Sequence, residues 1–210
     1  MDIQDLIDGH EVFKDEKFKK YENKFLDLVK NGQNPKVLFI ACSDSRVDPA
    51  LITNSSPGTL FILRNIGNFV PPFSPDDDYH ATAAGIEYAT SVLEVTDIIV
   101  CGHSHCGAIE SLYQDVDDIK LVHVKRWLEL GKNAKKQAER SCNSGVSHRK
   151  KLEVTEKFSI LFQMKNLLTY PEVKQRVEEG LLALRGWYYN IENGELEYFN
   201  DGKSQFMPMA

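Results

Sequence analysis

Two short apolar runs constrain the fold of this 210-residue chain more than any other feature, because one is followed at once by cysteine and charged residues and the other by histidine and cysteine. The first run is Val37–Ala41, and the residues Cys42-Ser-Asp-Ser-Arg46 follow it. The second is Asp97–Cys101, and Gly-His-Ser-His-Cys-Gly follows at 102–107. Continuous apolar runs are typical of strands buried on both faces of a parallel sheet. The sequence therefore predicts two parallel strands whose C-terminal ends carry functional side chains.

The rest of the chain alternates helical and strand patterns. A short strand is expected over Leu60–Leu63, and an alanine-rich helix over His80–Leu93. Near the C-terminus, Leu181–Ile191 and Glu195–Asn200 flank Asn193-Gly194, a strong hairpin signal. Further helices are expected over Ile119–Lys136, over His148–Leu168 and from Pro171 onward. These patterns predict an α/β fold with a mostly parallel β-sheet flanked by helices and a C-terminal antiparallel hairpin at its edge.

An amphipathic helix is expected ahead of the first strand. Apolar residues recur at three- and four-residue steps from Phe13 to Lys30, and Gly32 follows as a helix stop. We expect a single domain over 1–210, in which 1–32 form an N-terminal helical arm and 33–210 form the α/β core. Because the arm has no evident partner within the α/β unit, its apolar face is expected to pack on another subunit.

Charge and composition exclude several classes of function. The chain has 25 basic and 31 acidic residues and a net charge of −6, with the basic residues scattered, which argues against a nucleic-acid partner. No apolar stretch approaches the roughly 20 residues that a membrane-spanning helix needs. The aspartate-rich segment Met1–His10 does not resemble a secretory signal, so a cytoplasmic location is expected. The four cysteines are then ligands, nucleophiles or core residues rather than disulfides.

The strand ends predict a metal site. Cys42 follows one strand and His103-x-x-Cys106 follows another, and the carboxyl ends of parallel strands meet at one edge of a sheet. Two thiolates and one imidazole form a Cys₂His set, which is a catalytic zinc pattern because the fourth position remains available to water. In the alternative interpretation, His105 completes a closed structural site. Since His105 lies in a tight turn between His103 and Cys106, its ring is expected to point elsewhere.

A charged pair, Asp44 and Arg46, lies beside the first predicted ligand. Zinc with two thiolate ligands polarises water less than zinc with three imidazoles, so the site needs help to form hydroxide near neutral pH. Asp44 can accept a hydrogen bond from zinc-bound water, and Arg46 can hold that carboxylate ionised through a bidentate contact. The alternative is an ordinary surface salt bridge, which a position beside a ligand disfavours.

These motifs resemble those of the β-class carbonic anhydrases. The resemblance is strong over Gln33–Ala108, and the segments Gly186–Ile191 and Asn193-Gly194 are similar to the closing strand of that family. It implies a zinc enzyme that hydrates carbon dioxide reversibly to bicarbonate and a proton through zinc-bound hydroxide. The motifs that carry it are Ala-Cys42-Ser-Asp44-Ser-Arg46-Val, Pro57-Gly58, Arg64-Asn65-Ile-Gly-Asn68, Glu87-Tyr88-Ala and Cys-Gly-His103-Ser-His-Cys106-Gly.

The resemblance assigns roles to single residues. Cys42, His103 and Cys106 match the family's zinc ligands, and Asp44 with Arg46 matches its dyad. It also implies a homodimer as the minimum unit, with the arm reaching a neighbour and pockets at the interface. Gln33, Phe61, Ile66 and Tyr88 match substrate-pocket positions of plant-type members. Each pocket residue has a plainer interpretation as a core or loop residue.

One departure from the family pattern places the chain in a subgroup. An allosteric subgroup carries tryptophan three residues before the first cysteine ligand, where this chain has Phe39, so we expect the plant-type pocket. Two alternative functions stay open: hydrolysis of carbon disulfide or carbonyl sulfide at the same site, and a structural zinc module without activity. The candidates for proton transfer are His105, His80 and His123, among which the sequence does not choose. Cys101 is expected to be buried and Cys142 to be an exposed thiol.

Overall fold

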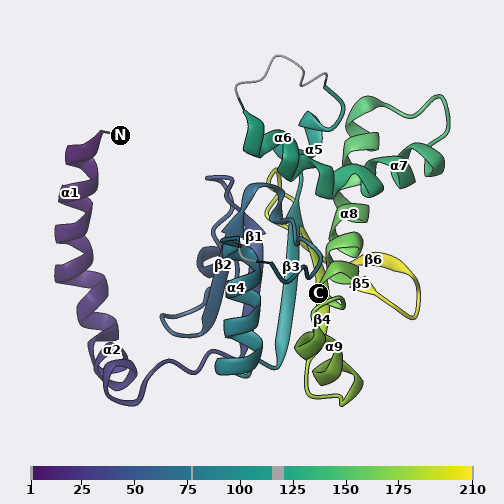
Figure 1. Ribbon diagram of the computed structural model, residues 1–210. Helices are drawn as coiled ribbons and strands as arrows, with labels where there is room; N and C mark the ends of the chain where they lie inside the picture. The colour runs from purple at the N-terminus through teal and green to yellow at the C-terminus, as the bar shows by residue number, and fades with distance from the viewer. Residues whose placement is uncertain (1, 77, 115–120, 210) are drawn as a thin grey trace.

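The computed structural model describes residues 2–76, 78–114 and 121–209 and contains a six-stranded sheet of order β2-β1-β3-β4-β5-β6 (Figure 1). Strands β2, β1, β3 and β4 run parallel, and β5 and β6 are antiparallel additions at one edge. The predicted α/β fold with a C-terminal hairpin edge is thus confirmed. The strands are β1 Val37–Cys42, β2 Leu60–Asn65, β3 Asp97–His103, β4 Ala183–Tyr189, β5 Leu196–Asn200 and β6 Gln205–Pro208.

The two central strands bring the predicted ligands to one edge of the sheet. In the parallel register Ala41 pairs with Cys101, so β1 and β3 end side by side. Both strands run longer than the apolar runs suggested, because Cys42 and His103 themselves close the strand ladders. Leu38 to Ala41 are fully buried, as expected for a strand covered on both faces.

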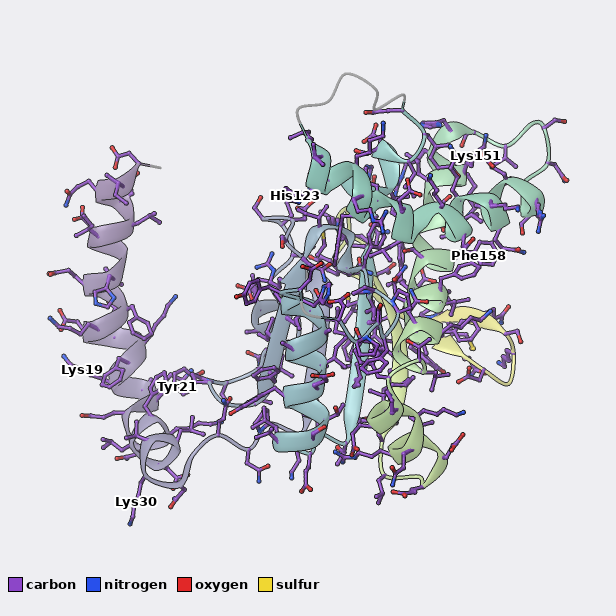
Figure 2. The ribbon with its side chains drawn as sticks, in the orientation of Figure 1. Lys19, Tyr21, Lys30, His123, Lys151 and Phe158 are labelled. Atoms are coloured by element: carbon purple, nitrogen blue, oxygen red, sulfur yellow. The ribbon has the colours of Figure 1, made fainter. Side chains whose placement is uncertain are left out.

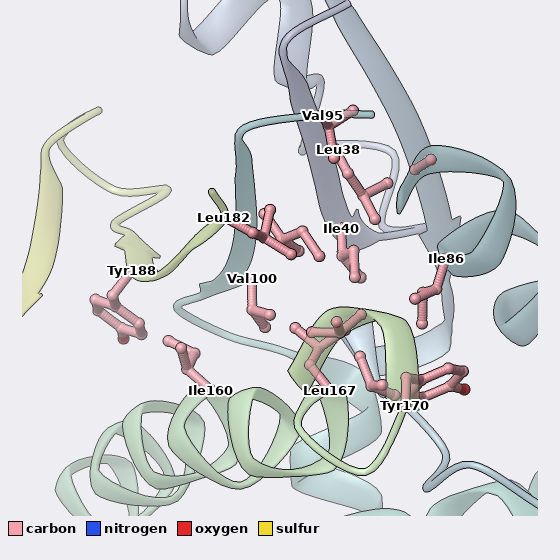
Figure 3. Close-up of a cluster of buried hydrophobic side chains, with 14 residues drawn as sticks. Leu38, Ile40, Ile86, Val95, Val100, Ile160, Leu167, Tyr170, Leu182 and Tyr188 are labelled. Atoms are coloured by element: carbon pink, nitrogen blue, oxygen red, sulfur yellow. The ribbon is translucent and has the colours of Figure 1, made fainter. Parts of the chain in front are cut away.

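Helices cover one face of the sheet with a large apolar core. Ile160 and Leu167 from α8, together with Ile86 from α4, pack on Ile40 and Val100 of the sheet (Figure 3). The opposite face carries a smaller cluster around Phe39 and Ile99. The helices in this part of the fold are α3 Pro49–Ile52, α4 Ala81–Glu87, α5 Gly107–Ser111, α6 Val122–Leu128, α7 Lys132–Ser141, α8 His148–Leu167 and α9 Pro171–Glu178.

The N-terminal arm stands apart from the sheet, and its helix begins earlier than predicted. It comprises α1 Ile3–Val12, a π-helical turn at Phe13–Phe18 and α2 Lys19–Asn31. The predicted start at Phe13 was wrong because Asp2 and Asp5 form a capping box that begins the helix at Ile3. No described residue of the arm is buried, and its side chains stand clear of the sheet (Figures 1 and 2). Helix α2 contacts the loop before β2, where Leu28 packs over Gly58 and Lys24 Nζ donates to Ser56 Oγ.

Several other boundaries differ from the sequence patterns. The helix expected over Ile119–Lys136 is interrupted by a 3₁₀ turn at Glu129–Gly131, which separates α6 from α7, and residues 119 and 120 lie outside the described residues. The helix expected over His80–Leu93 runs through α4 into a π-helical turn at Tyr88–Val92. Strand β6 was not predicted. None of the helices in the described ranges has the length and apolar character of a membrane span.

Candidate metal centre

Three side chains from separate elements converge at the carboxyl edge of the sheet. Cys42 ends β1, His103 ends β3, and Cys106 precedes the first turn of α5. Their potential ligand atoms all lie within 4.8 Å of one another. The three residues are 5%, 1% and 2% exposed, so bulk water does not compete for these atoms. The structure thus brings together the predicted ligand set.

The imidazole of His103 makes a hydrogen bond through one ring nitrogen and leaves the other ring nitrogen available to a metal ion. Its Nδ1 lies 2.9 Å from the backbone oxygen of Ser104, an arrangement in which Nδ1–H donates to that carbonyl. The other nitrogen, Nε2, is buried and has no hydrogen-bond partner among the described residues. A buried polar atom without a partner is costly, and a metal ion bound at Nε2 would remove that cost.

The contact between the two thiols shifts their pKa values in opposite directions. The pKa of Cys42 is lowered to about 4, first by a hydrogen bond from the Cys106 thiol and further by His103, against the opposing effect of burial. The pKa of Cys106 is raised by the same contact and by burial. The backbone N–H of Gly67 also donates to Cys42 Sγ over 3.3 Å. A thiolate is therefore favoured at Cys42, which is the form that binds metal.

Close approach at Gly67 requires a residue without a side chain. Gly67 has a positive φ of 75°, and a Cβ at this position would lie 2.9 Å from Cβ of Ala108. Both the backbone conformation and the contact disfavour any larger residue. The glycine thus lets its own N–H reach the sulfur of Cys42.

Asp44 and Arg46 form a bidentate pair beside the three ligands. Arg46 Nε donates to Asp44 Oδ1 over 2.9 Å, and Nη2 donates to Oδ2 over 2.7 Å. The Arg46 backbone N–H also donates to Oδ1 over 3.0 Å. These contacts, the guanidinium first among them, hold the pKa of Asp44 well below its usual range. The Asp44 carboxylate is turned to Arg46 and does not belong to the described group of potential ligands.

Arg64 holds the loop that carries Cys42 and Asp44, a role that the sequence analysis missed. Its Nε donates to the backbone oxygen of Cys42 over 3.0 Å, and its Nη2 donates to that of Asp44 over 2.7 Å. The sequence signal was the position of Arg64 near the end of β2, where Asn65 pairs with Cys42. The positively charged side chain of Arg64 is explained by the two backbone carbonyls to which it donates.

His105 points away from the three ligands, as expected. It adopts a left-handed backbone conformation with φ 57°, and its Nε2 lies 2.6 Å from Oε1 of Glu192. Its own carbonyl accepts a hydrogen bond from Arg46 Nη2 over 3.1 Å. The alternative closed site with His105 as fourth ligand is therefore absent from the described arrangement.

The predicted pocket residues are divided between the two ends of the strands. Ile66 lies beside the ligands, between Asn65 and Gly67. Phe61 and Tyr88 stack with ring centroids 5.8 Å apart, and Phe61 pairs with Leu38, four residues before Cys42 and about 13 Å away along the strand. Gln33 is exposed and precedes β1. Within one chain, only Ile66 joins the metal centre.

The remaining candidates lie outside the ligand group. His80 contacts Asp76 over 2.7 Å, and His123 lies on α6 (Figure 2). Cys101 is fully buried, as expected, and burial raises the pKa of its thiol to about 12. Cys142 is a free thiol that is only partly exposed.

A parallel sheet that gathers two thiols and one imidazole at its carboxyl edge, with a bidentate carboxylate–guanidinium pair beside them, defines an α/β protein with a candidate Cys₂His metal centre. The sequence comparisons give the family. Residues 37–196 match the family model described as carbonic anhydrase. The chain belongs to the β-class carbonic anhydrases and is a lyase, a carbonate dehydratase.

Individual relatives are similar to this chain over most of their length. A carbonic anhydrase of Synechocystis sp. is 42% identical over 92% of this chain and 70% of its own. One from Pseudomonas aeruginosa is 38% identical over 99% of this chain and 92% of its own. The solved structure of the β-carbonic anhydrase CcaA is 40% identical, with a TM-score of 0.90 over 99% of this chain and 92% of that one. β-Carbonic anhydrases of Sordaria macrospora, described as tetrameric, are 25% identical, with a TM-score of 0.83 over 99% and 98%.

Proposed function

We propose that Cys42, His103 and Cys106 bind Zn²⁺ and that the chain hydrates carbon dioxide reversibly to bicarbonate and a proton at this site. The observation that carries the proposal is the buried Nε2 of His103, which lacks a partner among the described residues and lies near two thiols. Sulfur and imidazole nitrogen are ligands that Zn²⁺ prefers, and three protein ligands are typical of a catalytic site. The donor set therefore fits zinc.

When bound, zinc lowers the pKa of a coordinated water molecule toward neutrality. The chain supplies the rest of the chemistry. Asp44 is held ionised by Arg46 and can accept a hydrogen bond from a water molecule at the site. This hydrogen bond orients the water and stabilises the partial positive charge on its proton. Arg64 fixes the backbone on either side of Ser43, so Asp44 and Cys42 keep a constant relative position. Asp44 is the catalytic residue in this scheme, and Arg46 and Arg64 are positioning residues.

The active form that we propose is a homodimer or a higher homo-oligomer. The arm exposes apolar side chains, with Ile7, Leu26 and Val29 52%, 60% and 84% exposed. The tetrameric Sordaria macrospora relatives support assembly. In such an assembly Gln33, Phe61 and Tyr88 would complete the plant-type pocket of a neighbouring subunit, since they lie far from Cys42 in their own chain.

Three further assignments belong to the same proposal. We assign 1–210 to one domain, with 1–32 as the arm and 33–210 as the catalytic core. We favour a cytoplasmic location because the site needs reduced thiols. We favour the plant-type subgroup because Phe39 is fully buried against Trp187, with ring centroids 5.8 Å apart, in place of the tryptophan of the allosteric subgroup.

The test is metal analysis of the purified protein combined with stopped-flow carbon dioxide hydration. We expect about one zinc ion per chain and hydration that is lost when zinc is removed and restored when it is added back. Sulfide release from carbon disulfide and carbonyl sulfide is assayed in parallel. Metal-free protein with full hydration activity, or sulfide release without bicarbonate formation, would contradict the proposal.

A further inference from the structure

A buried carboxylate lies directly behind the candidate metal centre. Glu156, in the middle of α8, is 2% exposed. An ionised group in such a position is costly unless its partners replace the lost water, and an apolar residue of similar size often serves stability as well. The presence of a charge here therefore calls for a specific role.

Both oxygens of this carboxylate are occupied. Oε1 accepts from the backbone N–H of Cys106 over 3.2 Å and from Arg149 Nη1 over 3.1 Å. Oε2 accepts from the Tyr188 hydroxyl over 2.7 Å and from Arg149 Nη2 over 3.4 Å. The carboxylate is thus held by its own helix and by β4. The contact that remains is the one to Cys106, a predicted metal ligand.

The turn that carries Cys106 needs external support. His105, between the two ligands of this turn, has the left-handed φ of 57°, which is unfavourable for a residue with a side chain. Arg46 holds the carbonyl of His105 over 3.1 Å from one side. Glu156 holds the next N–H, that of Cys106, from the other side. Two charged side chains therefore hold the carbonyl and the N–H of one peptide group, the one that joins His105 to Cys106.

Close packing of α8 on the sheet brings Glu156 to this position. A Cβ on Gly102 would lie 2.8 Å from the side chain of Ile160, one turn after Glu156. A Cβ on Gly186, in β4, would lie 2.9 Å from the sulfur of Met164. The two glycines allow the helix to approach β3 and β4 beside the ligand turn. The position of Glu156 beside the ligand turn therefore follows from the close packing of α8 on β3 and β4.

We propose that Glu156 is a positioning residue of the metal centre, whose carboxylate fixes the backbone of Cys106 and so the direction in which this thiolate meets the metal. The inference rests on the proposed zinc site. Because Arg149 balances the charge of Glu156, we expect Glu156 to affect the metal centre by positioning the Cys106 backbone and not by adding net charge. Partners that orient metal ligands in this way typically change metal affinity by about 10- to 100-fold when removed.

The experiment measures the rate at which zinc leaves the holoenzyme in excess chelator. Glu156→Leu removes the acceptor at similar size, Glu156→Gln keeps an oxygen acceptor for the Cys106 N–H, and Glu153→Gln is the matched control. Glu153 lies one turn earlier on α8 and pairs with Lys150 and Lys157. We expect zinc loss to be about 10- to 100-fold faster in Glu156→Leu, largely rescued in Glu156→Gln and unchanged in the control.

A second readout separates positioning from plain structural support. If Glu156 acts on the metal centre, Glu156→Leu reduces the rise in Tm that zinc gives to the metal-free protein, because that rise depends on metal affinity. If it serves the fold alone, the Tm falls equally with and without zinc, and the inference is wrong. Wild-type zinc retention in Glu156→Leu would also overturn it. A wild-type protein that binds no zinc would instead contradict the proposed function.

Discussion

Arg46 holds both carboxylate oxygens of Asp44 in a parallel, two-point contact, with the shorter of the two side-chain bonds 2.7 Å long. Such a contact fixes the direction of the carboxylate as well as its charge. The pKa of Asp44 is accordingly held well below its usual range, with the Arg46 side chain as the largest cause. Asp44 therefore stays ionised throughout the pH range in which the enzyme would work.

Replacing Asp44 by asparagine tests whether this carboxylate takes part in the chemistry. The amide occupies nearly the same volume but is not a charged acceptor. We expect Asp44→Asn to keep the fold and the metal and to lower carbon dioxide hydration by about 10²-fold, the usual scale for a lost proton acceptor. Stopped-flow hydration and metal analysis on the same sample measure both effects. Wild-type rates would show that the carboxylate is only structural.

Removing the guanidinium should free the carboxylate. In Arg46→Ala we expect Asp44 to turn toward the metal as a fourth ligand, with activity lost most strongly below neutral pH. X-ray absorption at the metal reports the added oxygen ligand, and stopped-flow assays report the pH profile. Arg185→Ala is the control because Arg185 pairs with Asp97 over 2.6 Å at the other end of β3. Equal effects of both substitutions would contradict a special role for Arg46.

The contact between Arg46 and Asp44 should stabilise the folded protein against unfolding by acid. The pKa of Asp44 is lower in the folded protein than its ordinary value, so its ionised form stabilises the folded state above pH about 4, and this stabilisation is lost as the pH falls. In protein from which zinc has been removed, so that Asp44 has no metal to bind, Arg46→Ala should therefore move the midpoint of acid unfolding to higher pH, as followed by circular dichroism. A midpoint that is unchanged or shifted to lower pH would count against the assigned cause.

The arm can be tested through its exposed apolar face. We expect the protein to have a solution mass of at least twice 23.9 kDa by light scattering. The double substitution Leu26→Asp and Val29→Asp should lower that mass and, because Gln33, Phe61 and Tyr88 would no longer reach a neighbour's pocket, lower activity as well. A wild-type protein that is monomeric by light scattering and fully active would contradict the proposed assembly.

The site residues that could be predicted from the sequence are those whose place follows from their position directly after a strand. Cys42 and His103 each follow an apolar run, so parallel pairing alone brings them to one edge. Glu156 was not predicted, because its role depends on how α8 packs over Gly102, about fifty residues earlier in the chain. The role of Arg64 was not predicted, because its position near a strand end does not show which backbone carbonyls its side chain binds.

The same distinction holds for the fold. The strands and the hairpin could be predicted because apolar runs and Asn193-Gly194 are local signals. The start of the arm depends on a capping box at Asp2, and the break between α6 and α7 on a 3₁₀ turn inside a continuous helical pattern. Strand β6 has a weak pattern of its own and forms by pairing with β5, as Phe206 does with Phe199.

The ligand set can be tested by substitution. Cys106→Ser should remove zinc and activity together, because a serine hydroxyl does not replace a thiolate at a zinc site. Cys142→Ser is the control, since Cys142 is a partly exposed thiol outside the ligand group. Metal content and hydration are measured for both proteins. Full zinc occupancy in Cys106→Ser, with His105 or another residue compensating, would refute the assignment.

The most direct measurement is anomalous diffraction at the zinc edge from crystals of the holoenzyme. We predict one strong peak per chain, about 2.3 Å from Sγ of Cys42 and of Cys106 and about 2.0–2.1 Å from Nε2 of His103. We also expect the Asp44 carboxylate to stay paired with Arg46. A peak bound through Nδ1 of His103, a peak elsewhere in the chain, or a well-ordered holoenzyme crystal with no peak would contradict the proposed zinc site.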